Sequence, residues 1–114
     1  MIGAEKESPI EISVRLTDHA LGNYRKAIEY HEKSLKIAIE IGDRDREGRT
    51  YANLGIAYIS LGDYRKAIKF LQKQLKIAIR FGDRRGEGRA HGNLGTAYGS
   101  LGNYQKAIEY NKKN

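Results

Sequence analysis

The chain has 114 residues, 31% of them charged and 39% hydrophobic, and its formal net charge at pH 7 is +7. Cysteine is absent, which excludes disulfide bridges and thiolate metal sites and favours a reducing, cytoplasmic location. No segment approaches the roughly 18 consecutive apolar residues of a membrane helix, and residues 1–10 lack the apolar core of a secretory signal, so we expect no membrane association.

Residues 1–20 do not match the rest of the chain. Ser8, Pro9 and Glu11 form a helix-start signal, with a capping serine, proline at the first helical position and glutamate three residues after the cap. This signal predicts a degenerate first helix over about residues 9–20. Two alternatives remain open. Apolar residues at positions 10, 12, 14 and 16 alternate as in a strand, and the segment could also be a flexible flank.

Residues 21–114 contain an internal repeat of forty residues. Residues 21–60 and 61–100 align without a gap and are identical at 25 of 40 positions, and a third, truncated copy covers residues 101–114. Self-similarity at such a period is typical of solenoid proteins, in which each repeat buries its apolar face against the next. We therefore expect one array of about two and a half repeats over residues 21–114.

Each repeat predicts two helices joined by tight turns. Apolar residues keep helical three-and-four spacing over about residues 45–60 and again over about 64–81. Between them, Gly62 can adopt the left-handed conformation that ends a helix, and Asp63 can cap the next one. Asn23 and Asn103 hold the same capping position, so a turn is expected at each. Such short connections make neighbouring helices antiparallel, which predicts an all-α solenoid of helical hairpins.

Aromatic residues recur at fixed places in the repeat. Tyr58 recurs as Tyr98, and Tyr64 recurs as Tyr24 and Tyr104. Recurrence at the same repeat position is typical of packing residues, so we expect all five tyrosines to lie in the core rather than to stack on nucleic-acid bases.

The residues of one hairpin resemble a known family. Tyr51, Leu54-Gly55, Tyr58, Gly62-Asp63-Tyr64, Ala67 and Leu71 follow the tetratricopeptide repeat pattern, and the next copy follows it with His91, Leu94-Gly95 and Tyr98. The resemblance implies a right-handed α-solenoid that binds other proteins. Ser34, Gln74 and Asn114 depart from the alanine of the family's second helix. The forty-residue subtype, with its IGDR, EGR and NLG segments, is similar to the repeats of LGN/Pins-type scaffold proteins.

No constellation of residues indicates catalysis. His19, His31 and His91 are far apart in sequence, and none has a second histidine or a cysteine at metal-ligand spacing. Nucleophile, phosphate-loop and dinucleotide motifs are missing as well. His91 replaces an aromatic residue and is expected to pack in the core. We therefore predict no catalytic residue, no metal, no cofactor and no enzymatic activity.

The first helices of successive hairpins are expected to line the concave face of the stack. Arg49 and Asn53 are four residues apart, hence on one helix face, and Arg89 and Asn93 repeat the arrangement. Arginine offers a fork of donors for a carboxylate, and an asparagine amide can hold an extended backbone. The candidate peptide-binding residues are Arg49, Asn53, Ile56, Ser60, Arg89, Asn93, Thr96 and Ser100. Alternatives are pairing of the arginines with Glu47 and Glu87, and a structural amide bond between hairpins.

The resemblance to LGN/Pins-type repeats indicates the partner. In those proteins the matching arginine and asparagine positions contact extended, glutamate-rich segments, which implies an extended acidic segment of another protein here. Ile56 and Thr96 stand where that family often has asparagine, so the groove is expected to be more apolar and to accept an aliphatic side chain.

Two other partners remain open. Residues 61–100 carry a net charge of +6, so a polyanion such as nucleic acid is an alternative, although not the favoured one. The last copy stops inside its second helix, which would leave Tyr104, Ile108 and Tyr110 on an exposed terminal face. That face would suit a homodimer or a further repeat.

Overall fold

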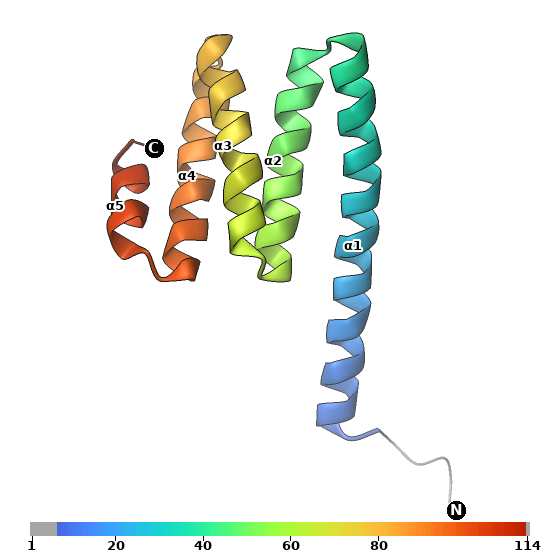
Figure 1. The fold of residues 1–114 in the computed structure, drawn as a ribbon. Coiled ribbons are helices and arrows are strands. Elements are labelled where there is room, and N and C mark those ends of the chain that lie inside the picture. The colour runs from blue at the N-terminus through green and yellow to red at the C-terminus, as the bar shows by residue number, and fades with distance from the viewer. Residues whose placement is uncertain (1–6, 114) are drawn as a thin grey trace, which may run out of the picture.

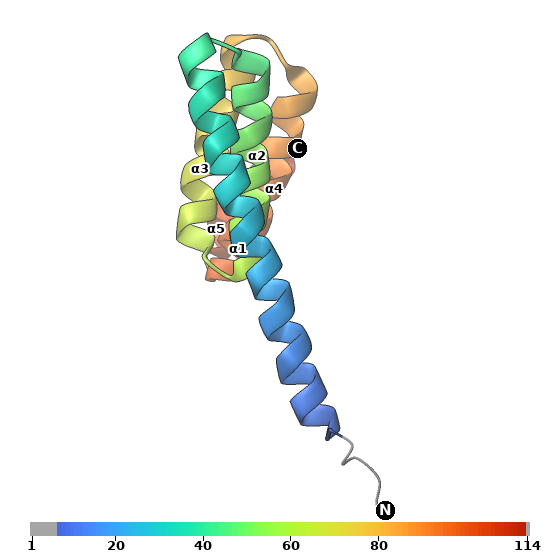
Figure 2. The ribbon, with the colours of Figure 1, turned by 90° about the vertical axis from the view of Figure 1, so that its right-hand side faces the viewer.

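The computed structural model describes residues 7–113, which form five α-helices in a row (Figure 1). The helices are α1 (Pro9–Ile41), α2 (Arg44–Leu61), α3 (Tyr64–Arg80), α4 (Arg84–Leu101) and α5 (Tyr104–Lys113). Each helix packs against the next in sequence, and α2 also contacts α4. Viewed along the row, α2 and α4 lie on one side and α3 and α5 on the other (Figure 2). This two-layer stack of hairpins is an α-solenoid.

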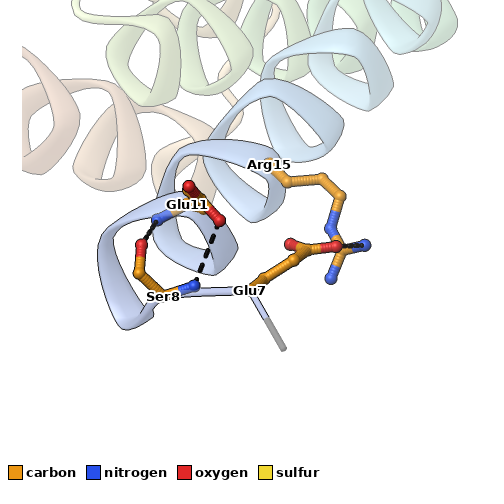
Figure 3. Close-up of polar contacts among 4 residues, drawn as sticks. All are labelled: Glu7, Ser8, Glu11 and Arg15. Carbon is orange, nitrogen blue, oxygen red and sulfur yellow. Dashed lines mark hydrogen bonds and ion pairs between the residues drawn. The ribbon is translucent and has the colours of Figure 1, made fainter. Parts of the chain in front are cut away.

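The start of α1 is capped as the sequence predicts. The Ser8 hydroxyl accepts a hydrogen bond from the Glu11 amide at 3.1 Å, and the Glu11 carboxylate accepts one from the Ser8 amide at 3.1 Å (Figure 3). Arg15 adds an exposed ion pair to Glu7 at 2.8 Å. Because each side chain satisfies the other's backbone donor, this capping box fixes where the helix begins. Residues 9–20 are helical and do not form a strand.

The expected turn at Leu21-Gly22-Asn23 is absent, and α1 runs straight through it. The blue half of α1 projects beyond the stack in Figure 1. Asn23 therefore caps nothing, in contrast to the sequence prediction. The difference follows from the close packing between α2 and α3, whose hairpin does form. A Cβ built on Gly55 would lie 2.5 Å from Leu71 Cδ2, so this hairpin closes only around glycine.

Arg15 stands forty residues before Gly55, in the segment that does not match the repeat. A side chain at that position would prevent residues 9–20 from packing back on the rest of α1. Glu11, the equivalent of buried Tyr51, would also bring a carboxylate into that contact. Without the packing that closes a hairpin, the chain keeps its helical backbone hydrogen bonds through Gly22 instead.

The other junctions follow the sequence prediction. Among the described glycines, only Gly42, Gly62, Gly82 and Gly102 have positive φ, between 70° and 93°, and each follows a helix. The next side chain caps the following helix: Asp63 accepts from the Lys66 amide at 3.2 Å, and Asn103 accepts from the Lys106 amide at 3.2 Å. Asp43 and Asp83 cap α2 and α4 in the same way. The bounds of α2 and α3 lie within one residue of those expected.

Two apolar clusters hold the stack together. Leu54 and Ala57 of α2 bury Ile28 of α1, whereas Leu71 of α3 joins Leu94 and Ala97 of α4 and Ala107 of α5. Leu54, Leu71 and Leu94 are fully buried. Because each cluster links one hairpin to the next, stability comes from neighbouring repeats rather than from one central core.

The recurring tyrosines are only partly in the core. Tyr98 is buried and stacks on Tyr110 at 5.5 Å, and half-buried Tyr58 stacks on Phe70 at 5.6 Å. Tyr24 and Tyr104 are exposed, by 39% and 69%, and Tyr64 is half-buried, so the prediction of five core tyrosines is wrong for this set. Tyr64 and Tyr104 are the first residues of α3 and α5, whereas Tyr24 lies inside α1.

Candidate functional site

A groove of about 570 Å³ lies between α2 and α4, with the carboxyl-terminal half of α3 beneath it. Its volume is within the range of protein ligand sites. The residues that line it come from three helices and one connecting loop: Arg44, Asp45, Gly48, Arg49, Ala52, Asn53, Ile56, Gln74, Ile77, Ala78, Phe81, Asp83, Arg85, Gly86, Arg89 and Asn93.

The groove brings together five of the eight candidate residues. Arg49, Asn53 and Ile56 come from α2, and Arg89 and Asn93 come from α4. Ser60, Thr96 and Ser100 do not line it. They are exposed and lie nearer the carboxyl ends of α2 and α4, and the Thr96 hydroxyl donates to the Gly92 carbonyl at 3.2 Å. The candidate site therefore occupies the amino-terminal and middle turns of the two helices.

The apolar part of the groove comes partly from α3, which the sequence prediction omitted. Ile77 and Ala78 line the groove from α3, and Phe81, 56% exposed, follows that helix. Gly48 allows the approach, since a Cβ built there would lie 3.3 Å from Ile77 Cγ2. The sequence offers one signal of this apolar surface. Ile77 stands one residue before buried Ala78 and lies on the α3 face turned toward α2.

Gln74 is a buried polar residue beside this apolar surface. It is only 6% exposed, and its Nε2 donates to the Gly86 carbonyl oxygen at 3.4 Å. A carbonyl oxygen can only accept, which fixes the amide orientation and leaves Oε1 buried without a hydrogen-bond partner among the described residues. The side chain stands where the family pattern has alanine, and it ties α3 to the first turn of α4.

The arginines of α2 are paired with carboxylates of the same helix. Arg49 lies 3.0 Å from Asp45, and Arg44 lies 2.7 Å from Glu47. The alternative of an Arg49–Glu47 pair is therefore not realised, because residues i and i+4 share a helix face whereas i and i+2 do not. Glu47 is buried and faces Arg44 and Tyr51.

The arginines of α4 are less neutralised. Arg84 lies 3.5 Å from Glu87, so Glu87 does not pair with Arg89. Within residues 7–113, neither Arg85 nor Arg89 has an ion pair or a contact with an aromatic ring. Both also line a second, more open depression on α4 that includes Asn93.

The two groove asparagines lie on the same surface as the groove arginines. Asn53 is exposed and Asn93 is half-buried, and no hydrogen bond joins either amide to another side chain of the described range. The suggested structural amide bond between hairpins is thus not formed by these residues.

No metal-binding constellation is found in the part of the chain that the structure describes, where no three His, Cys, Asp or Glu side chains come close enough to hold an ion. His91 lies half-buried, tilted against the Tyr110 ring at 5.8 Å. None of helices α1 to α5 is long and apolar enough to cross a membrane.

Stacked hairpins with a groove along one layer define a helical-repeat protein of the solenoid class. Within this class, the tetratricopeptide repeat family matches residues 16–78 and 59–113, and the chain belongs to that family. Among solved structures, the crystal structure of the TPR domain of Arabidopsis FLU is similar. Its TM-score is 0.76 at 26% identity, and the match covers 87% of this chain and 85% of that one.

None of the curated proteins matches the chain. Family membership nevertheless defines a functional class, because tetratricopeptide repeats generally mediate protein–protein interaction and are typically non-enzymatic scaffolds.

Proposed function

We propose that the chain binds an extended, acidic segment of another protein in the groove between α2 and α4. The observation that carries this proposal is that Arg49, Asn53, Arg89 and Asn93 line one groove. Guanidinium groups bind carboxylates through paired hydrogen bonds, and the amides can donate to and accept from a peptide backbone.

The shape and chemistry of the groove fit a chain better than a compact ligand. Its polar residues repeat from one hairpin to the next, so an extended segment meets the same pair of groups twice. Ile56, Ile77 and Phe81 between them offer apolar surface for one aliphatic side chain of that segment. The resemblance to LGN/Pins-type repeats supports the acidic character of the partner, and this subtype assignment is itself part of the proposal.

The test is a titration of labelled extended peptides, some acidic and some with glutamine in place of glutamate, followed by fluorescence polarisation. We expect acidic peptides to bind the wild type and Asn93→Ala to weaken their binding about thirtyfold, because two net hydrogen bonds of about 1 kcal/mol each are lost. Asn23→Ala is the matched control, since Asn23 is an exposed asparagine on α1 away from the groove. Binding that ignores Asn93→Ala would contradict the proposal.

Binding of a polyanion through the outer basic residues is a different outcome of the same titration. Phosphate binding falls steeply and log-linearly with salt. It would also survive Asn93→Ala and be lost on changes in α3. The lysines there already cover aromatic rings, with Lys66, Lys69 and Lys73 between 5.5 and 6.0 Å from ring centroids, which gives this basic surface a packing role.

Self-association through α5 is a second candidate, favoured by the exposure of Tyr104 and Ile108, at 69% and 55%. Tyr110 is not available in the same way, because it stacks on Tyr98. Light scattering over a concentration series tests the homodimer: a mass that rises to twice that of the chain supports it, and a constant monomer mass rejects it.

A further inference from the structure

The two arginine positions of the groove differ through one neighbouring residue. Asp45 of α2 and Arg85 of α4 hold the same place in successive repeats, each four residues before the groove arginine. In α2 this neighbour is an anion, and it pairs with Arg49 at 3.0 Å. In α4 the neighbour is a second cation on the same helix face as Arg89.

This exchange makes the α4 side of the groove the stronger anion attractor. Arg85 and Arg89 repel each other, as like charges at i and i+4 do. Arg85 also lies in the first turn of α4, where the helix dipole is positive and cations are disfavoured. A bound carboxylate would relieve both effects, whereas at α2 it would have to compete with Asp45 for Arg49.

The remaining charges of the groove strengthen the contrast. Asp45 at the α2 wall repels an incoming carboxylate, and Arg44 is already paired with Glu47. Arg85 and Arg89 are the groove cations without an ion pair or an aromatic contact among residues 7–113, and Asn93 lies beside them in both depressions.

From this asymmetry we infer that Arg85 and Arg89 form the carboxylate subsite of the groove, and that Arg85 determines its specificity for an acidic side chain. The acidic residue of the bound segment lies over α4, and its aliphatic residue lies over Ile56 and Ile77. The inference rests on the proposed function and adds to it that the two repeats are not equivalent binding units.

A charge reversal tests the subsite. Arg85→Asp copies the α2 arrangement onto α4 and gives Arg89 an internal partner. We measure binding of extended leucine-containing peptides that place one glutamate at each position in turn, together with the same peptides carrying glutamine. Arg85→Asp should weaken the best glutamate peptide at least tenfold, about 1.4 kcal/mol, and change its glutamine counterpart by no more than about twofold.

The reverse exchange should produce a gain. Asp45→Arg frees Arg49 and removes a repelling carboxylate, so the α2 wall acquires a similar arginine pair. We expect tighter binding of peptides with two glutamates, by about threefold or more, with peptides of one glutamate changing less. Arg65→Asp is the control for Arg85→Asp, because it makes the same charge change at an exposed α3 residue outside the groove.

We expect Arg85→Asp to fold, so that its loss of binding does not reflect unfolding. The substitution adds an i,i+4 ion pair and places an acidic residue in the first turn of a helix, and both stabilise the helix. An unfolding midpoint no lower than that of the wild type verifies this. Equal loss with Arg65→Asp, or equal loss of glutamate and glutamine peptides, would overturn the subsite. If no peptide binds the wild type, the proposed function itself fails, whereas binding that depends on Arg49 and not on Arg85 refutes only the inference.

Discussion

The helices α2 and α4 occupy equivalent places in successive repeats, yet their groove-facing turns carry different charges. Both retain the buried leucine, the groove arginine and the groove asparagine: Leu54, Arg49 and Asn53 in α2, and Leu94, Arg89 and Asn93 in α4. The residues beside this shared set have changed, and Asp45 is replaced by Arg85. A solenoid can thus keep its stacking contacts while single exposed substitutions give each repeat its own ligand chemistry.

The two helices differ in packing as well as in charge. Gly55 of α2 lies against Leu71, which is fully buried, whereas Gly95 of α4 lies against Asn111, which is exposed on α5. The glycine therefore faces a neighbour with little room to move in one repeat, Leu71, and a movable side chain in the next, Asn111.

The largest difference is expected from alanine at these two glycines. A Cβ at position 55 would lie 2.5 Å from Leu71 Cδ2, and the surrounding core leaves that side chain little room to move. Gly55→Ala should therefore lower the free energy of unfolding by about 2 kcal/mol, as overpacked cores do. Gly95→Ala should be neutral or up to about 1 kcal/mol stabilising, because Asn111 can turn to solvent and alanine favours helix. Urea unfolding of both variants checks the order, and equal losses would contradict it.

A smaller, pH-dependent difference in stability is expected one turn before these glycines, where α2 has Tyr51 and α4 has His91. Burial, followed by the negative charge of Glu47, raises the pKa of Tyr51 above its usual range. The folded state therefore favours the neutral phenol. This contribution is complete below the ordinary tyrosine pKa of about 10 and is lost as the pH rises through the raised value.

Urea unfolding between pH 8 and 11 measures this effect. The wild type should lose stability above about pH 10 more steeply than Tyr51→Phe, which has no phenol to ionise. Because the two proteins share every other ionisable group, the difference between their pH profiles is the informative quantity. Parallel pH profiles would show that Tyr51 does not contribute.

The sequence was sufficient to predict the array, because the same helix and turn signals occur in two full copies of the repeat. Hydrophobic spacing, Gly62 and Asp63 located α2 and α3 to within one residue. The placement of Arg49, Asn53, Arg89 and Asn93 in one groove follows from helix periodicity. These features depend on neighbours along one helix, which sequence spacing describes well.

The errors arose where a contact between helices decides the outcome. The motif Leu21-Gly22-Asn23 reads as a turn, but Arg15 replaces the glycine that would let the hairpin close. Ile77 and Phe81 enter the groove from α3, which the prediction assigned to the outer layer. The missing turn has no local signal, because it depends on what a distant helix presents, whereas Ile77, one residue before buried Ala78, is a local signal of the apolar surface.

The smallest difference is expected from the exposed ion pair of α2. Asp45 and Arg49 are 77% and 71% exposed at the side chain, so solvent screens their attraction. Asp45→Asn should lower the free energy of unfolding by about 0.3 kcal/mol at low salt and by less at high salt, as for other i,i+4 pairs. In α4, Arg85→Gln should instead raise it by a similar amount, because it removes repulsion from Arg89. Opposite signs for two changes at equivalent positions, measured by thermal unfolding at two salt concentrations, would establish that α2 neutralises its groove arginine and α4 does not. The same sign for both would mean that the charge exchange leaves the two repeats electrostatically alike.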